Sequence, residues 1–262
     1  MNILEAIIAE KRIEVELRKK QVPLENLRLS ALYDRPGFSL IEFLQSDSHT
    51  GIIAEFKRKS PSKGIINDKA NVVDVTRAYA DHGASALSVL TDHSFFGGSI
   101  EDLIAARVNN LPILRKDFII DEYQLEEARA MGSDAILLIA ACLNPDEVRK
   151  LAKAAQELGL EVLLELHDEA ELGHVCEFTP IVGINNRNLK TFSVDIERSL
   201  AMASRLPEGT IKVAESGIDN VANIRIFREH GFRGFLIGEH FMKAPDPGKA
   251  FADFVADLNN MK

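Results

Sequence analysis

Short apolar runs alternate with longer charged stretches along most of the chain. Beyond about residue 50 these runs recur roughly every 20–35 residues, which is the length of one strand plus one crossover helix. Eight runs are present: Ile52–Phe56, Ala86–Leu90, Pro112–Leu114, Ala135–Ile139, Val162–Leu166, Ile181–Ile184, Ile211–Ala214 and Gly234–Ile237. Amphipathic stretches lie between them, among them Asp68–Asp81, Asp121–Ala130, Pro145–Leu158 and Asp219–Glu229. Apolar strands that alternate with helices predict a parallel sheet covered on its outer face.

Glycines support this division because they stand where four of the predicted helices should end. They are Gly83, Gly132, Gly159 and Gly231, and glycine readily takes the left-handed conformation that closes a helix. Eight strand–helix units in a little over 200 residues predict a (β/α)₈ TIM barrel. A doubly wound open sheet is the alternative, but it would usually carry a glycine-rich nucleotide-binding turn after its first strand, and this chain carries none.

The residues before the first run predict an N-terminal helical extension. Apolar positions within 3–8 fall on one face of a helix, and the basic residues 18–20 suit its carboxyl end through the helix dipole. No linker or low-complexity segment divides the chain. We therefore expect one domain over 1–262, with the extension over 1–48 lying across one end of the barrel and eight βα units over 49–262.

Composition mainly excludes classes of protein. Asp and Glu number 40 against 31 Lys and Arg, a net charge of −9 that argues against a dedicated nucleic-acid binder. Cys142 and Cys176 stand far apart and indicate neither a disulfide framework nor a zinc site. No apolar run approaches the roughly 20 residues of a membrane span, and Glu5 and Glu10 interrupt the apolar start of the chain. We expect a cytoplasmic protein with no nucleic-acid, membrane or obligate protein partner.

Charged and polar residues follow five of the predicted strands. They are Glu55 and Lys57 after the first, Lys116 after the third, Glu165 after the fifth, Asn185 and Arg187 after the sixth, and Glu215 after the seventh. In a parallel barrel such residues meet at one mouth, and residues two apart, such as Glu55 and Lys57, both point inward. They could merely form ion pairs that tie the mouth together. Both signs of charge converging from five strands favour an acid–base site.

Small residues follow the last two strands. Ser216 and Gly217 come after the seventh, and Gly238 and Glu239 after the eighth, where barrels of this kind usually bind phosphate through backbone N–H groups. We expect the Glu239 side chain to turn away from the anion. The segment 57–64 is the one basic cluster of the chain. It is either a solvated loop or, as we favour, a flexible cover that gathers an anionic substrate.

Other candidate groups carry weaker signals. The seven histidines lack a metal-ligand spacing such as H-E-x-x-H, so we expect no metal. His167 lies two residues beyond Glu165, and we expect it to support that side chain. Phe95 and Phe96 either line an aromatic pocket or anchor a loop.

Five segments that contain these residues occur in the order and at the spacing of a known family. They are Ile52–Ser62, Leu114–Phe118, Leu164–His167, Gly183–Leu189 and Val213–Ile218. Together they resemble the signature of the indole-3-glycerol phosphate synthase family, and the match runs from the extension to the final helix. Glu239 and His240 depart from it, because many members have small hydroxyl residues there. The departure puts side-chain contacts to phosphate in doubt.

The resemblance implies a TIM-barrel carboxy-lyase of tryptophan biosynthesis that uses no cofactor. Its phosphorylated substrate would be 1-(2-carboxyphenylamino)-1-deoxyribulose 5-phosphate, and its products indole-3-glycerol phosphate, carbon dioxide and water. The family's general acid corresponds to Lys116, and its base for dehydration to Glu165. Glu55 would tune Lys116 or assist dehydration. Lys57 would meet the substrate carboxylate or act as a second acid.

The remaining matches concern binding of the substrate. Asn185, Arg187, Glu215 and Ser216 match residues that orient it, and Ser60 lies in a mobile first loop. Gly217, Gly238 and Glu239 match the backbone that grips phosphate. Family members lay the extension over the barrel mouth, which implies that it helps to form the aromatic pocket.

Two other functions compete with this interpretation. Phosphoribosylanthranilate isomerase is also a phosphate-binding barrel, but it lacks the extension and the Glu-x-Lys-x-x-Ser-Pro-Ser segment that begins at Glu55. A catalytically silent barrel would be expected to lose at least one of the matching charged residues, and this chain keeps Glu55, Lys57, Lys116, Glu165, Asn185 and Glu215.

Overall fold

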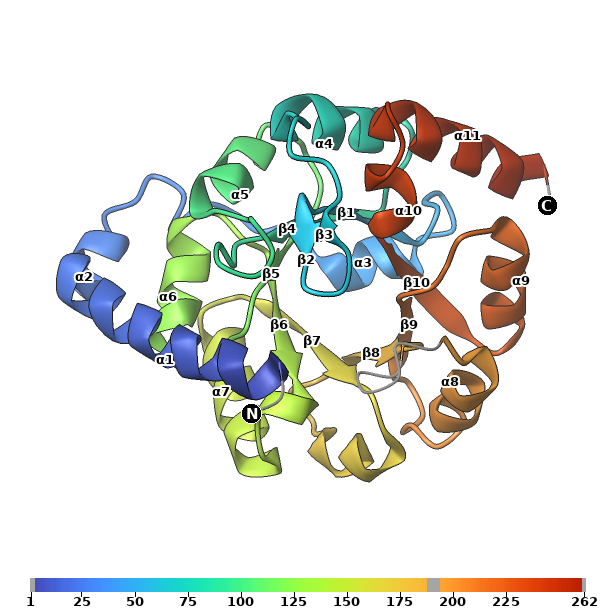
Figure 1. Ribbon diagram of the computed structural model, residues 1–262. Coiled ribbons are helices and arrows are strands. Elements are labelled where there is room, and N and C mark those ends of the chain that lie inside the picture. The colour runs from blue at the N-terminus through green and yellow to red at the C-terminus, as the bar shows by residue number, and fades with distance from the viewer. Residues whose placement is uncertain (1–2, 188–193, 261–262) are drawn as a thin grey trace.

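A closed barrel of eight parallel strands lies at the centre of the computed structural model, which describes residues 3–187 and 194–260 (Figure 1). The strands are β1 (Ile52–Phe56), β4 (Ala86–Leu90), β5 (Ile113–Lys116), β6 (Ala135–Ile139), β7 (Glu161–Leu166), β8 (Ile181–Asn185), β9 (Ile211–Glu215) and β10 (Phe232–Ile237). Strand β1 pairs in parallel with both β4 and β10, which closes the sheet. The (β/α)₈ TIM barrel is therefore confirmed, and the open sheet is excluded.

The strands start and stop close to the predicted apolar runs, and three of them extend further at their carboxyl ends. β5, β8 and β9 continue past their apolar runs to include Lys116, Asn185 and Glu215. Backbone pairing carries on there, because Lys116 is in register with Leu90 and Asn185 with Glu215. These strand ends thus hold polar side chains in the rigid sheet rather than in loops.

Helices cover the outer face of the barrel (Figure 1). They are α4 (Val72–Asp81), α5 (Ile100–Ala106), α6 (Tyr123–Ala130), α7 (Pro145–Glu157), α8 (Ile196–Ala203), α9 (Val221–Glu229) and α11 (Pro247–Asn260), with short turns α10 (Glu239–Met242), η1 (Ala140–Cys142) and η2 (Glu169–His174). Side-chain caps begin several of them, including a reciprocal capping box between Asn144 and Glu147 at α7. The four glycines predicted to end helices all have positive φ angles, as expected.

Apolar side chains form two main layers. The larger lies between the strands and the outer helices and includes Tyr79, Phe227, Phe235 and Phe251. The second fills the inside of the barrel toward the amino ends of the strands. The inner layer extends to Ile139 at the end of β6, while polar residues occupy the carboxyl ends of β5, β8 and β9. No helix within residues 3–187 and 194–260 has the length and apolar character needed to cross a membrane.

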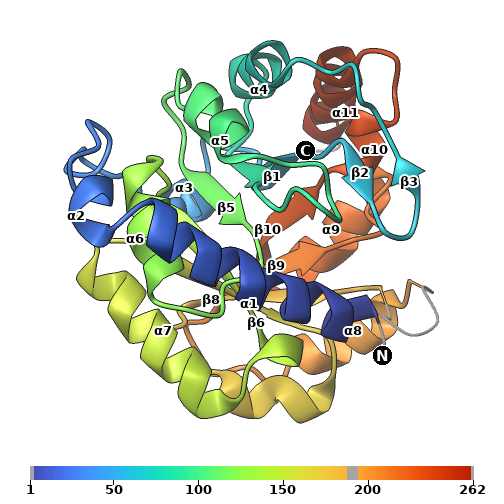
Figure 2. The same ribbon diagram turned by 60° about the vertical axis from the view of Figure 1, so that its left-hand side comes forward.

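The N-terminal extension is divided between the two ends of the barrel. Its helices are α1 (Ile3–Gln21), α2 (Leu24–Leu27) and α3 (Leu40–Gln45). Both views show α1 beside α6, and the start of α1 reaches the mouth at the carboxyl ends of the strands (Figure 1, Figure 2). The expectation that the extension lies across one end is therefore correct for α1 and wrong for α3.

Helix α3 closes the opposite end. Leu40 and Leu44 are buried against the inner apolar layer, which includes Ile181 and Ile211 from the first positions of their strands. The Glu161 carboxylate at the start of β7 accepts hydrogen bonds from Ser39 Oγ (2.6 Å) and the Ile41 backbone N–H (2.9 Å). The physical reason for this placement is that the amino end of the inner layer needs an apolar cover.

Candidate active site

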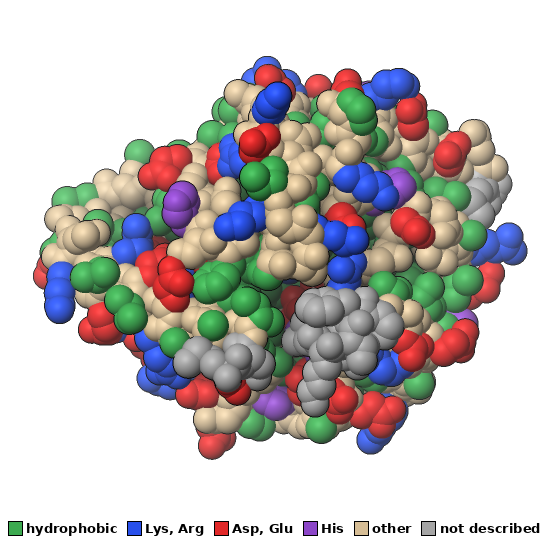
Figure 3. Space-filling view, viewed as in Figure 1, with side chains coloured by type: hydrophobic (Ala, Val, Ile, Leu, Met, Phe, Trp, Pro, Cys, Tyr) green, Lys and Arg blue, Asp and Glu red, His purple; other side chains and the backbone are tan. Residues whose placement is uncertain are grey.

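A cavity of about 1600 Å³ opens at the carboxyl ends of the barrel strands. It lies near the centre of the face seen in Figure 3, with Lys and Arg side chains beside it. Every site residue predicted from the sequence lines it: Glu55, Lys57, Ser60, Lys116, Glu165, Asn185, Arg187, Glu215, Ser216, Gly217, Gly238 and Glu239. Asn188 and Leu189 of the matching segments lie outside the described residues.

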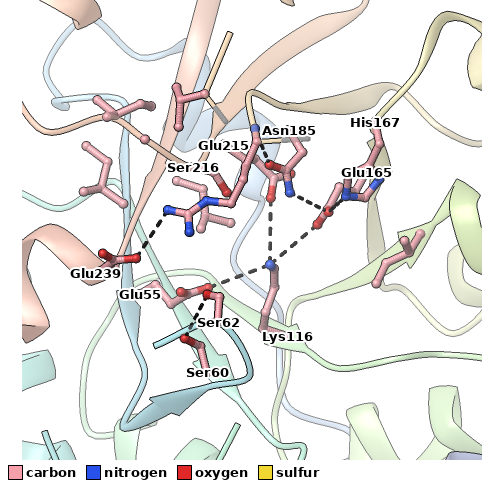
Figure 4. Close-up of a pocket in the computed structure, with 18 of the residues that line it drawn as sticks. Glu55, Ser60, Ser62, Lys116, Glu165, His167, Asn185, Glu215, Ser216 and Glu239 are labelled. Carbon is pink, nitrogen blue, oxygen red and sulfur yellow. Dashed lines mark hydrogen bonds and ion pairs between the residues drawn. The ribbon is translucent and has the colours of Figure 1, made fainter. Parts of the chain in front are cut away.

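Lys116 stands among three carboxylates that come from three other strands (Figure 4). Its Nζ lies 3.6 Å from Glu165 Oε2, 3.8 Å from Glu55 Oε2 and 3.8 Å from Glu215 Oε2. Burial alone would lower the pKa of Lys116, but the three carboxylates outweigh it and raise the pKa above its ordinary value. The site therefore holds Lys116 as a cation that can donate a proton.

Glu55 is buried and shared between two lysines. Its Oε1 lies 2.6 Å from Lys57 Nζ, as expected for two inward-pointing residues of one strand. Burial would raise the pKa of Glu55, but the charges of Lys57 and Lys116 outweigh it and lower the pKa. Gly238 makes room for this side chain, because a Cβ there would lie 2.6 Å from Glu55 Oε1.

Two hydrogen bonds orient the carboxylate of Glu165. Its Oε1 lies 2.8 Å from His167 Nε2 and accepts from Asn185 Nδ2 at 2.9 Å. Burial opposes ionisation of Glu165, but the Lys116 charge and the His167 imidazole lower its pKa. His167 therefore contacts Glu165, where the sequence placed it as a support, and Glu165 is held as an ionised base.

Glu215 differs from the other two carboxylates. Neither of its oxygens has a hydrogen-bond partner among the described residues, and Lys116 is the cation nearest to it at 3.8 Å. Burial and the neighbouring Glu165 charge raise the pKa of Glu215 well above its ordinary value. Gly183 opposite leaves space for the carboxyl group, since a Cβ there would lie 2.0 Å from Glu215 Oε1. The site thus lowers the pKa of Glu165 and raises that of Glu215, a separation of the kind that acid and base roles require.

The turns after β9 and β10 form the other side of the cavity. Ser216 and Gly217 both have positive φ angles, of 66° and 69°. The Glu239 carboxylate lies 3.4 Å from Arg187 Nη2 and 3.6 Å from Lys63 Nζ. The expectation that this side chain turns away is wrong, because the two cations hold it at the cavity wall. Figure 4 labels Glu239 at this position.

The basic segment 57–64 forms a small hairpin from β2 (Lys59–Ser60) and β3 (Gly64–Ile65). Arg58 pairs with Asp102 of α5 and stacks on a phenylalanine ring, while Lys59 donates to a backbone carbonyl. Lys57 and Ser60 line the cavity, and Arg58 and Lys59 do not. The idea that the whole cluster gathers a substrate is therefore wrong for these two side chains, which carboxylate and carbonyl oxygens already engage.

Aromatic and apolar groups line the side of the cavity nearest to α1. Phe96 lines the cavity and packs against Phe118 at 6.0 Å between ring centroids, whereas Phe95 is not part of the lining. Ile3, Leu4 and Ile7 of α1 join them. The cavity therefore has an apolar wall beside its charged floor.

Among the residues near the site that sequence reasoning missed is Lys11 of α1. Its side chain is 1% exposed and forms ion pairs with the loops that follow β4 and β5. A signal was present, because Lys11 lies between Ile7 and Val15 on the same stripe of the helix. A lysine in the middle of a buried stripe needs carboxylate partners.

Comparison with solved structures shows the fold. A chain of a tryptophan synthase complex from Pyrococcus furiosus is 16% identical with a TM-score of 0.61, and the match covers 81% of this chain and 99% of that chain. A structure described as native KDPGal is 16% identical with a TM-score of 0.59, covering 82% and 96%. At these identities the likeness concerns the barrel alone.

Comparison of sequences shows the family. An indole-3-glycerol phosphate synthase from Bacteroides thetaiotaomicron is 48% identical over 255 residues, which cover 97% of this chain and 98% of the relative. Another from Polynucleobacter asymbioticus is 43% identical, with coverage of 97% and 99%. The family model described as indole-3-glycerol phosphate synthase matches residues 4–254. With this match and these relatives added to the barrel and its charged mouth, the chain belongs to the indole-3-glycerol phosphate synthase family.

Proposed function

We propose that the chain closes the pyrrole ring of indole-3-glycerol phosphate, starting from 1-(2-carboxyphenylamino)-1-deoxyribulose 5-phosphate and releasing carbon dioxide and water. Membership of the family supports the reaction. The observation that carries it is Lys116 standing among Glu55, Glu165 and Glu215 at the barrel mouth. A cation and three carboxylates of different pKa can give and take the protons that the reaction moves.

The first step forms a carbon–carbon bond. The ring carbon that bears the carboxylate attacks the ketone carbon, and Lys116 protonates the developing alkoxide. Carbon dioxide then leaves from the same ring carbon, and its bonding electrons restore the aromatic ring. Lys116 is suited to this role because it lies at the floor of the cavity and is protonated. Lys57 remains the second candidate for this acid or for the partner of the substrate carboxylate.

The second step is dehydration. The new hydroxyl group leaves as water, and a proton is lost from the five-membered ring near the amine, which completes the indole. We assign the base to Glu165, whose carboxylate is ionised and oriented by His167 and Asn185. Glu215, whose pKa is raised, or the ion pair of Glu55 with Lys57 can supply the proton to the leaving hydroxyl.

The remaining groups bind the substrate in this proposal. The backbone of Gly217, Gly238 and Glu239 would hold phosphate, with Ser216 and Ser60 beside it. The benzene ring would lie against the apolar wall formed by the start of α1 and Phe96. Arg187, held by Glu239, and Asn185, held by Glu165, would orient the sugar chain.

Turnover of the purified protein tests the proposed function. Incubation with the carboxyphenylamino substrate should produce the fluorescence of indole-3-glycerol phosphate. Phosphoribosylanthranilate serves as the matched alternative substrate, because its conversion would indicate an isomerase instead. No fluorescence at saturating substrate would contradict the proposal.

Replacing Glu239 with Gln should lower KM several-fold and leave kcat nearly unchanged. The carboxylate places a negative charge beside the expected phosphate and occupies Arg187 and Lys63. Its removal relieves a repulsion of about 1 kcal/mol, which corresponds to roughly fivefold in affinity. Inhibition constants for inorganic phosphate should fall in parallel. Glu157→Gln, an exposed change on α7, is the control. An unchanged KM and phosphate affinity would place the phosphate elsewhere.

A further inference from the structure

Lys11 forms a buried ion network where α1 meets the barrel. Its Nζ lies 2.7 Å from Glu14 Oε2, 3.1 Å from Asp92 Oδ2 and 3.0 Å from Asp117 Oδ1. Asp92 follows β4 and Asp117 follows β5, so one ammonium group joins α1 to two adjacent strand ends. Desolvating these charges is costly, and a helix can dock on a barrel through apolar contacts alone. The arrangement therefore calls for an explanation other than docking.

The network includes both chain neighbours of Lys116, the proposed general acid. Arg115 and Asp117 are the chain neighbours of Lys116, and their side chains form an ion pair with each other, while the Lys116 ammonium lies among the three carboxylates of the mouth. Arg115 is buried, bonding to Asp117 Oδ2 at 3.1 Å and donating to the Gln124 carbonyl at 2.7 Å. Thr91 Oγ1 donates to Asp117 Oδ2 at 2.6 Å. Both neighbours of Lys116 are thus fixed by contacts that do not involve the Lys116 side chain.

The backbone of Lys116 is held by the same unit. Its carbonyl accepts from the Thr91 backbone N–H at 3.1 Å, and Thr91 stands between β4 and Asp92. Lys11 is the cation that bridges Asp92 and Asp117. Losing it would leave two buried carboxylates facing one another, and these would repel and separate the strand ends. The Lys116 ammonium would then shift relative to its three carboxylates.

We propose that Lys11 is a positioning residue, which holds the end of β5 so that Lys116 meets the reacting carbonyl. This inference rests on the proposed function, because it assigns Lys11 to the step in which Lys116 acts. It separates two contributions of α1. The apolar residues at its start bind the substrate ring, and Lys11 aligns the acid.

Lys11→Met tests the proposal in the full-length protein. We expect kcat, corrected for the folded fraction, to fall at least about tenfold, with KM within about threefold of the parent. Lys19→Met is the matched control. Lys19 also joins α1 to the barrel, through Asp121 Oδ2 at 2.7 Å, but lies outside the network around Lys116. It should leave kcat unchanged.

A second variant separates positioning from stability. Lys11→Met combined with Asp92→Asn removes one buried cation and one buried anion together. The amide oxygen that Asp92→Asn introduces can still accept the hydrogen bonds that Asp92 accepts from the Phe95 and Phe96 backbone N–H groups. We expect this protein to melt closer to the parent than Lys11→Met does while its kcat stays low, because the bridge to Asp117 is still missing. The double variant also tests the proposal if Lys11→Met alone does not fold.

Two results would overturn the proposal. One is a Lys11→Met protein, or the double variant, with the parent's kcat. The other is a change confined to KM, which would make α1 a wall of the pocket only. An inactive parent would instead contradict the proposed function, so the two failures are distinguishable.

Discussion

Replacing Lys116 with Met should lower kcat by a factor of about 10² or more, since loss of a general acid typically has this effect. Methionine keeps the length of the side chain but removes the proton and the charge. KM should change less, because the groups expected to hold phosphate lie on the other side of the cavity. Steady-state kinetics with the carboxyphenylamino substrate provide the measurement. Lys57→Met is the matched comparison, and near-normal kcat in Lys116→Met would move the acid role to Lys57.

The same variant should show a pH-dependent loss of stability. Lys116 lowers the pKa of Glu55 and Glu165 against the opposing effect of burial. Without this charge the pKa of both groups rises, and the pKa of Glu215, which is already above its ordinary value, rises further, so the folded state binds more protons than the unfolded state. Stability then falls as pH rises, and the deficit relative to the parent should be larger at about pH 8 than at about pH 5. Urea unfolding at both pH values checks this sign.

Replacing Glu165 with Gln should lower kcat by a factor of about 10² to 10³ and separate the two products in time. Carbon dioxide leaves before dehydration in the proposed sequence, and Glu165 acts in dehydration. Single-turnover experiments should therefore show carbon dioxide release ahead of indole fluorescence. Gln is nearly isosteric and can still accept the hydrogen bond from Asn185.

The control for this variant is Glu171→Gln. Glu171 Oε2 lies 3.9 Å from His167 Nδ1, whereas Glu165 contacts Nε2 of the same ring, and Glu171 also accepts the His167 backbone N–H at 2.6 Å. In the Glu171→Gln protein, carbon dioxide release and indole fluorescence should appear at the same rate. If Glu165→Gln also releases both products together, Glu165 serves the first step or binding instead, and the base must be sought elsewhere.

Much of the barrel could be predicted because parallel strands covered by helices must be apolar throughout. β1, β4 and β6 coincide with their apolar runs for this reason. The charged residues at the mouth could be placed because inward-facing residues at the carboxyl ends of parallel barrel strands meet at one mouth. The distances between these residues and the order of their pKa values could not be predicted. Both depend on contacts between adjacent strands, such as that of Gly183 with Glu215.

The features that escaped prediction depend on partners distant in sequence. The apolar pattern of α3 does not say which end of the barrel it covers, and that choice follows from Glu161, 122 residues after Ser39. Likewise, a basic segment such as 57–64 predicts charge but not which carboxylates will engage each cation. Arg58 pairs with Asp102 on a helix that no local pattern connects to it.

The cover formed by α3 also has a consequence for synthesis of the chain. Ser39 and Ile41 leave the ribosome long before Glu161, which is translated about 120 residues later. At about 5–20 residues per second, the interval lasts roughly 6–24 s. During that time the apolar side chains of Leu40 and Leu44 have no barrel to enter. The nascent chain therefore displays a short apolar segment near its amino end, which is where a chaperone would be expected to bind it before the barrel closes.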